Sequence, residues 1–226
     1  MIANRSLKLV FALSLSLALV GCSQPVAPAT AAPATPVAAT AAAPATGEIH
    51  PAGGTYQLDP DHTGVLVQWT HFGLSQPSAH FRVGSGTLTW DAADVTRSHV
   101  EVTLPIAAID TFVPALDAHL KQADFFDVGK YPTATFKSTS VQAAGPNRFT
   151  VIGDLTIKDK THPVTLEVTL NGAGKHGMTG LESLGFSATG QVKRSDFGVD
   201  AFAPAVSDVV MLRITGEGSI AAAKQE

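Results

Sequence analysis

The sequence predicts an all-β antiparallel domain with one short helical segment. Apolar and polar residues alternate in many short stretches, turn-forming residues separate these stretches, and only one segment shows helical spacing. Many short alternating strands with one small helix are typical of an antiparallel barrel or of a sandwich. The alternation by itself does not separate these two architectures.

The first clear strand covers residues 64–72, in which Val65, Val67, Trp69 and His71 share one face. The same period of two recurs further along the chain, and the count of expected strands is near eight. Two neighbouring strands should form a hairpin whose turn lies near 158–162, because their apolar faces then align. The further expected strands cover residues 87–90, 99–106, 151–157, 164–170, 184–192 and 209–220.

A short helix should begin at Pro114, because proline suits the first turn, and Leu116 and Leu120 lie four residues apart on one face. After the helix, Pro132 favours an extended chain at the residue before it and leads into a strand. Phe136 lies on one face of that strand. The helix and the strand enclose an aromatic pair, Phe125 and Phe126.

The amino-acid sequence of these segments resembles that of the YceI family of bacterial envelope proteins. The resemblance is carried by DAHLKQADFFDVGKYPTATF (117–136), YQLDPDHT (56–63), HFGLS (71–75), GDLTIKDKTHPVTL (153–166), Phe186, RSDFGV (194–199) and VSD (206–208). It covers residues 55–220 and implies an elongated, eight-stranded lipocalin-like barrel that binds polyisoprenoid or other long-chain lipids. Asp159, Val209 and Gly84 depart from the family pattern, and Gly84 is expected to affect the width of the cavity.

An eight-stranded barrel is just wide enough to be filled by side chains or to hold one small ligand, so each lining residue is a candidate either for plain core or for ligand contact. His71 is either a hydrogen-bonded core histidine or a contact for a polar head group. We selected the expected lipid-binding residues from the inward-facing side of each alternating strand and from the aromatic segment. They are Val65, Val67, Trp69, His71, Phe81, Leu88, Phe112, Leu116, Phe125, Phe126, Phe136, Leu155 and Phe186.

The N-terminus has the layout of a secretory signal. Arg5 and Lys8 precede an apolar stretch over 9–20 that is too short to span a bilayer. The stretch ends in Leu-Val-Gly-Cys22, which resembles the bacterial lipobox, so Cys22 is expected to be acylated and to anchor an exported protein to a membrane. Ser23 after the cysteine favours the outer membrane, with the domain facing the periplasm.

The expected organisation is a signal peptide over 1–21, a disordered tether over 22–54 and a lipid-binding barrel over 55–222. The tether is rich in alanine, proline and threonine, and residues 23–54 hold six of the fourteen prolines. Cys22 is the only cysteine, which excludes a disulfide within the chain.

Charge and motif content disfavour several function classes. Removing residues 1–21 takes away two basic residues and changes the formal charge from −4 to −6, which disfavours nucleic-acid binding. The eight histidines show no metal-ligand spacing, and the acids of 59–64 imitate only the first half of a calcium loop. Since nucleophile-elbow and phosphate-loop motifs are absent, no enzyme activity and no metal are expected.

The sequence therefore predicts a protein that binds, carries or stores a long-chain lipid such as a polyisoprenoid or an isoprenoid quinone. No cofactor is expected apart from that lipid, and a homodimer is compatible with the family. The alternative is a filled barrel that acts as an interaction or stress-protection module. An enzyme of lipid metabolism would require two titratable groups that converge on an open pocket.

Overall fold

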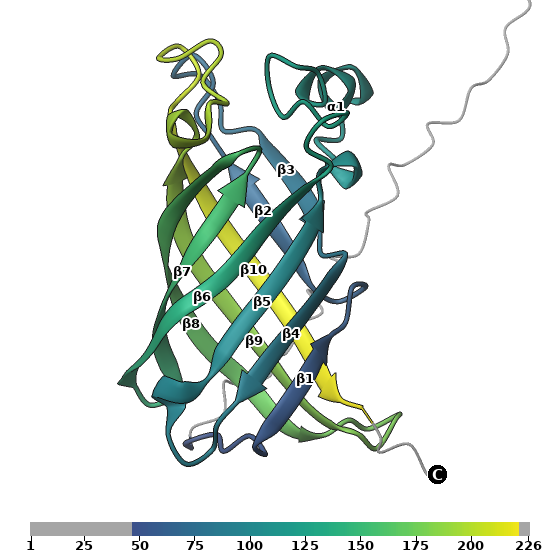
Figure 1. Ribbon diagram of the computed structural model, residues 1–226, viewed down its shortest axis with the longest axis vertical. Helices are drawn as coiled ribbons and strands as arrows, with labels where there is room; N and C mark the ends of the chain where they lie inside the picture. The colour runs from purple at the N-terminus through teal and green to yellow at the C-terminus, as the bar shows by residue number, and fades with distance from the viewer. Residues whose placement is uncertain (1–46, 222–226) are drawn as a thin grey trace, which may run out of the picture. The chain divides into compact units, whose positions relative to one another are not determined.

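The computed structural model describes residues 47–221, which form an antiparallel β-barrel with a single short helix (Figure 1). The all-β barrel expected from the sequence is confirmed. No helix in the described part of the chain is long and apolar enough to cross a membrane. The strands are β1 (Gly54–Leu58), β2 (Gly64–Gln68), β3 (Ser78–Arg82), β4 (Ser85–Trp90), β5 (His99–Pro105), β6 (Thr133–Gly145), β7 (Arg148–Ile157), β8 (Lys160–Lys175), β9 (Glu182–Lys193) and β10 (Val209–Ile220), and the helix is α1 (Pro114–Leu120).

Eight barrel strands form a closed ring, because β1 with β2 and β3 with β4 each act as one interrupted strand. β1 and β2 both pair with β10, and residues 59–63 form the turn between them. β3 pairs with β2, whereas β4 pairs with β1 and β5. From β4 to β10 the neighbours follow chain order through β5, β6, β7, β8 and β9, so pairing of β10 with β1 and β2 closes the ring.

Several predicted elements occur where the sequence places them. The helix spans Pro114–Leu120, with the proline in its first turn. The β7–β8 hairpin turns at residues 158 and 159, where Lys158 adopts a left-handed φ of 59°. The strand expected over 64–72 ends earlier, at Gln68, and His71 lies beyond it in an isolated bridge to Ser75 and Val206.

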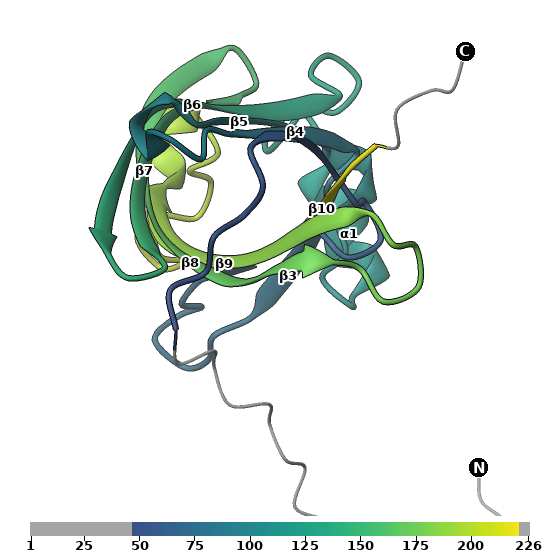
Figure 2. The ribbon, with the colours of Figure 1, turned by 90° about the horizontal axis from the view of Figure 1, so that it is seen from below.

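One end of the barrel, called the base here, is closed by the segment over 47–53 (Figure 2). The amide of Ile49 donates to Oδ1 of Asn147 (2.7 Å), and Nδ2 of Asn147 donates to the carbonyl of Gly47 (3.0 Å). Ile49 packs against a cluster that includes Leu184 and the fully buried Tyr56. Composition places residues 47–53 in the tether, yet they cover the barrel. The rest of the predicted tether and the signal peptide lie outside the described residues.

The opposite end, called the mouth here, is formed by the β2–β3 loop, the segment around α1 and the segment between β9 and β10 (Figure 1). Backbone hydrogen bonds join the first and last of these. The amide of Phe72 donates to the carbonyl of Ala205 (2.7 Å), and the amide of Ser207 donates to the carbonyl of Thr70 (2.9 Å). The mouth is therefore an ordered arrangement of three connections.

Replacing Tyr56 with phenylalanine should lower the free energy of unfolding by about 1 kcal/mol. The buried hydroxyl of Tyr56 donates to the carbonyl of Ala52 (2.7 Å). In the variant this carbonyl has no hydroxyl donor. Tyr131→Phe is the matched control, because its exposed hydroxyl donates to Asp159 at 3.2 Å and should contribute little. Urea unfolding of the three proteins measures the difference, and equal losses for both variants would contradict the role given to Tyr56.

The pH dependence of the same variant gives a second test. Burial raises the pKa of Tyr56, and the nearby Glu182 raises it further. The protonated hydroxyl of Tyr56 therefore stabilises the folded state fully below the ordinary tyrosine pKa of about 10. This stabilisation is lost as the pH rises through the higher pKa of Tyr56 in the folded state. We expect the wild type to lose stability above about pH 10 more steeply than Tyr56→Phe, as measured by thermal unfolding. Parallel curves would contradict this expectation.

Candidate functional site

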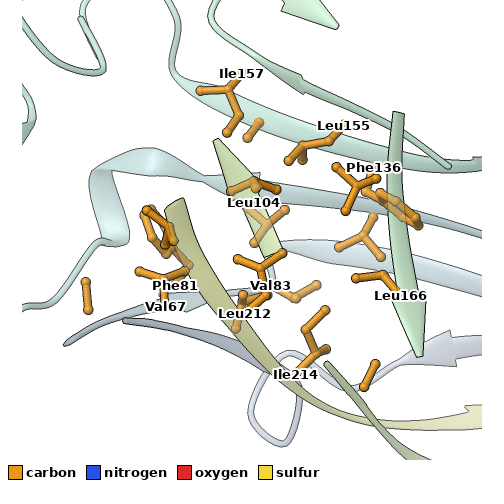
Figure 3. A pocket seen from close by; sticks show the side chains of 18 of the residues that line it. Val67, Phe81, Val83, Leu104, Phe136, Leu155, Ile157, Leu166, Leu212 and Ile214 are labelled. Atoms are coloured by element: carbon orange, nitrogen blue, oxygen red, sulfur yellow. The ribbon is translucent and has the colours of Figure 1, made fainter. Parts of the chain in front are cut away.

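The barrel interior holds a cavity of about 780 Å³. Its wall is almost entirely aliphatic and aromatic, as the sticks in Figure 3 show. Volumes of 300–1,000 Å³ are usual for sites that hold one small-molecule ligand. The residues labelled in Figure 3 are Val67, Phe81, Val83, Leu104, Phe136, Leu155, Ile157, Leu166, Leu212 and Ile214, contributed by seven strands and the β3–β4 connection.

The apolar wall follows from the period of two along each strand. In β10, Val210, Leu212 and Ile214 line the cavity, whereas Met211 between the first two is exposed. In β7, Leu155 and Ile157 line it in the same way. Every barrel strand therefore presents one apolar row to the interior and the other row to solvent or loops.

Two glycines keep the lumen open by giving aromatic rings a place against the wall. A Cβ added at Gly216 would overlap the ring of Phe186, and one added at Gly153 would overlap the ring of Phe136. The paired strands bring these residues opposite or nearly opposite each other, with Phe186 facing Gly216 across β9 and β10. Each ring thus occupies the space above a neighbouring glycine, and its bulk extends less far into the lumen.

The two ends of the cavity differ in chemistry. At the base, Leu170, Leu184 and the edge-to-face pair of Trp90 and Phe149 (5.4 Å between ring centroids) close the lumen. At the mouth, polar groups join the lining, chiefly His71, His119 and Arg194. An amphipathic ligand would therefore place its apolar part inside and its polar end at the mouth.

Arg194 organises one side of the mouth through backbone carbonyls. Its Nε donates to Ser207 (2.8 Å), one terminal nitrogen donates to Val199 (2.7 Å) and Ala201 (2.8 Å), and the other donates to Val206 (2.7 Å). Burial lowers the pKa of Arg194, an effect that the nearby acids Asp208 and Asp200 oppose. The guanidinium group therefore holds the segment from Val199 to Ser207 in place.

The next residue strengthens the same connection. The backbone amide and the hydroxyl of Ser195 donate to the two carboxylate oxygens of Asp208 at 2.8 and 2.7 Å. The hydroxyl bond is the main reason why the pKa of Asp208 is lowered. The RSD and VSD motifs that sequence analysis singled out thus form one hydrogen-bonded clasp beside the mouth.

Twelve of the thirteen predicted site residues line the cavity. They are Val65, Val67, Trp69, His71, Phe81, Leu88, Leu116, Phe125, Phe126, Phe136, Leu155 and Phe186. His71 is exposed at the mouth, so it is not a core histidine, and its ring packs edge-to-face on Phe72 (4.7 Å between centroids). Whether these residues contact a lipid remains a prediction.

Phe112 does not line the cavity, and its predicted position is corrected. Its side chain is 76% exposed. The residue lies in a turn with a left-handed φ of 62°, where its amide donates to Oδ1 of Asp110 (2.8 Å). This turn directs the ring away from the lumen, which the spacing of apolar residues did not reveal.

Gly84 also needs a correction, because it does not set the cavity width. A Cβ there would meet Cδ of Pro105 at 2.9 Å, and the neighbouring Val83 is the residue that lines the lumen. The sequence interpretation also missed much of the aliphatic wall. The alternation of β8 already gave Leu166 an inward position, but the choice of aromatic residues left it out.

Few titratable side chains line the opening of the cavity at the mouth, namely His71, His119 and Arg194. Nε2 of His119 lies 3.0 Å from a carboxylate oxygen of Asp124, and this is its one side-chain hydrogen bond within residues 47–221. In that part of the chain no three His, Cys, Asp or Glu residues are grouped to hold a metal ion. The acids of 59–64 instead form a turn, in which Oδ1 of Asp59 accepts from the amide of Asp61 (2.9 Å).

The chain matches the family model described as a YceI-like domain over residues 56–218. It belongs to the YceI family. A UPF0312 protein of Pseudomonas putida (strain W619) is 38% identical over 165 residues, which cover 72% of this chain and 85% of the relative. Protein YceI of Escherichia coli O157:H7 is 37% identical with the same coverage.

Solved structures show the same fold. The YCEI protein of Campylobacter jejuni is 30% identical, with a TM-score of 0.61 over 68% of this chain and 90% of that one. BcnA of Burkholderia cenocepacia is 25% identical, with a TM-score of 0.63 over 71% and 98% of the two chains. A polyisoprenoid binding domain from Saccharophagus degradans is 10% identical and shares the fold, with a TM-score of 0.54 over 74% and 98%.

Gly216→Ala should narrow the lumen, because the added methyl group displaces the ring of Phe186. Affinity for an apolar fluorescent probe such as N-phenylnaphthylamine should fall about fourfold for each methylene-sized volume lost, or ~0.8 kcal/mol. Gly185→Ala is the matched control on the neighbouring strand, since its Cβ would meet only a carbonyl oxygen at 3.8 Å. Equal probe affinity for the two variants would contradict the role of Gly216.

Proposed function

We propose that this protein binds, carries or stores a long-chain amphipathic lipid of the polyisoprenoid or isoprenoid quinone type in the bacterial envelope. One observation carries the proposal, namely an almost entirely apolar cavity of about 780 Å³ that is closed at the base. Among its lining residues the one Asp, Glu, Lys or Arg is Arg194, which lies at the mouth. Such a cavity accepts a single chain with its apolar end first.

The energetics support a ligand of this class. Each buried methylene contributes about 0.8 kcal/mol, so ten of them contribute roughly 8 kcal/mol. Part of this offsets the ordering of a flexible chain and the loss of its free motion. A long apolar chain therefore gains useful affinity from the wall alone, without any ion pair inside the lumen.

The fold is compatible with the proposed ligand. The barrel domain from Saccharophagus degradans, which shares the fold at 10% identity, is described as polyisoprenoid binding. At this identity the likeness bears on the architecture alone. It supports the proposal by showing that such a barrel is used for a ligand of this class.

The filled-barrel alternative is less well supported. A barrel packed by its own side chains would leave no room for a ligand, whereas this one encloses a ligand-sized volume. For an enzymatic role, the mouth offers the hydrogen-bonded pair of His119 and Asp124. Within the described chain, no serine, threonine or cysteine side chain is hydrogen-bonded to His119.

The location of the protein is proposed from its N-terminus. Cys22 after an apolar stretch favours acylation, and acyl chains would anchor the mature protein to a membrane, with Ser23 favouring the outer one. The barrel would then face the periplasm. This anchoring concerns residues outside the described part of the chain.

Tryptophan fluorescence offers a direct test of ligand binding. Trp69 and Trp90 are the two tryptophans of the chain, and both line the cavity. All barrel elements and their core lie within residues 47–221, so a chain that starts at Ser23 keeps the whole folded unit without the acyl anchor. Titrating the delipidated protein with a short-chain isoprenoid quinone should quench this fluorescence saturably at one quinone per barrel.

A double variant, Phe125→Ala with Phe136→Ala, should weaken this binding at least about tenfold, or ~1.4 kcal/mol, because two aromatic wall contacts are removed. Met178→Ala is the control, since that side chain is 92% exposed in the β8–β9 turn. Circular dichroism confirms that the variants keep the barrel. Unchanged quinone affinity in the double variant would contradict the site, and no saturable quenching in the wild type would contradict the proposed ligand class.

A further inference from the structure

Large apolar side chains surround the mouth of the cavity and face solvent. We call them the mouth rim, and they come from the β2–β3 loop, the turn before α1 and the β9–β10 segment. The rim consists of Phe72 (58% exposed), Leu74 (87%), Phe112 (76%), Val113 (50%) and Phe202 (61%). Soluble proteins seldom gather exposed aromatic side chains at one end without a binding role.

The rim is continuous with the cavity. Phe72, Val113 and Phe202 line its opening, while Leu74 and Phe112 lie outside it. Phe202 also stacks on Phe125 of the lumen wall, with 6.2 Å between ring centroids. An apolar path therefore runs from the outer rim into the lumen.

Backbone conformation places the rim aromatics at solvent. Phe72, Phe112 and Phe202 all have left-handed φ angles, of 51°, 62° and 64°. They account for half of the six non-glycine residues with positive φ within residues 47–221. Bulky residues rarely adopt this conformation, and such strained positions concentrate at functional sites. Phe72 and Phe202 make aromatic contacts with His71 and Phe125, yet all three rim rings stay more than half exposed.

The charge around the rim narrows the choice of partner. The segments over 110–132 and 194–208 carry seven aspartates and three basic residues, and residues 69–77 carry no Asp, Glu, Lys or Arg. These three segments thus carry a formal charge of −4, and the β7–β8 turn that contacts them, with Lys158, Asp159 and Lys160, changes the sum to −3. Two copies meeting mouth to mouth would repel each other, and an anionic membrane would be repelled as well.

We propose that the mouth rim inserts into the surface of a zwitterionic lipid bilayer, so that the ligand passes between bilayer and lumen without crossing water. This inference rests on the proposed function and deepens it by naming the source of the ligand. A neutral bilayer offers an apolar interior to the phenylalanines and no repulsion to the aspartates. It is also the phase in which a long-chain lipid resides.

The chain outside the described residues is long enough for this arrangement. The described chain begins at Gly47, at the base, which is the end remote from the rim. If Cys22 is acylated as proposed, the 24 intervening residues reach up to ~80 Å when extended. A twelve-residue strand such as β10 is about 40 Å long, so the mouth can turn towards the anchoring membrane.

Sedimentation with phosphatidylcholine vesicles tests the inference, using the chain from Ser23 onward so that no acyl anchor contributes. The variant Leu74→Ser with Phe112→Asn removes two rim side chains that do not line the cavity, and asparagine tolerates the left-handed backbone at 112. Met178→Ser removes an equally exposed side chain at the base. We expect the wild type and Met178→Ser to bind vesicles equally, also at high salt, and the rim variant to bind at least tenfold more weakly.

Quinone transfer separates this inference from the proposed function. The rim variant should keep the wild-type affinity for quinone in solution, yet extract quinone from loaded vesicles at least tenfold more slowly. Equal vesicle binding by the rim variant and the wild type would overturn the inference. The inference would also be overturned if the wild type did not bind vesicles but formed a dimer, and the rim variant did not form that dimer. Vesicle binding that depends on the rim, without quinone binding by any variant, would support the docking surface and contradict the ligand class.

Discussion

The pairing of β10 with β1 and β2 is the constraint on which the rest of the structure depends, because it converts a row of strands into a ring. Closure removes the free sheet edges that would otherwise invite aggregation. It also separates an inside from an outside, so that the period of two along each strand becomes a wall. The twelve residues of β10 contact β9 along one edge and both parts of the interrupted strand along the other.

The asymmetry between the two ends gives the ring a direction. At the base, Asn147 ties down the segment that contains Ile49, and Tyr56 is buried beneath it. At the mouth, the guanidinium group of Arg194 donates its hydrogen bonds to backbone carbonyls and fixes the loop that carries Phe202. A closed apolar base and an ordered open mouth suit a ligand that enters with one end first and leaves the same way.

Local patterns predicted much of this architecture. Alternation placed β7, β8 and β10, and Pro114 with Leu116 and Leu120 placed the helix. The barrel itself came from the family resemblance, since alternation describes a sandwich equally well. The inward side of most strands followed from parity, because a closed sheet leaves only one buried face.

The remaining features depend on contacts that no local pattern contains. The position of Phe112 follows from a turn held by Asp110, and the cover over the base follows from a hydrogen bond between residues 98 apart in the chain. The start of β10 is apolar on both faces, so its exposed Met211 and its lumen-facing Leu212 look alike in sequence. Whether inward side chains fill a barrel or leave a cavity depends on summed volumes and on glycines such as Gly216 beneath an aromatic ring.

The central claim is that the lumen holds a lipid in the cell. Its most direct test is to purify the protein from a bacterial envelope under mild conditions, extract it with organic solvent and identify the extracted molecules by mass spectrometry. We expect one isoprenoid or other long-chain lipid per barrel, and less of it from the Phe125→Ala, Phe136→Ala variant. An empty extract from both the Ser23 chain and the full-length protein would contradict the claim.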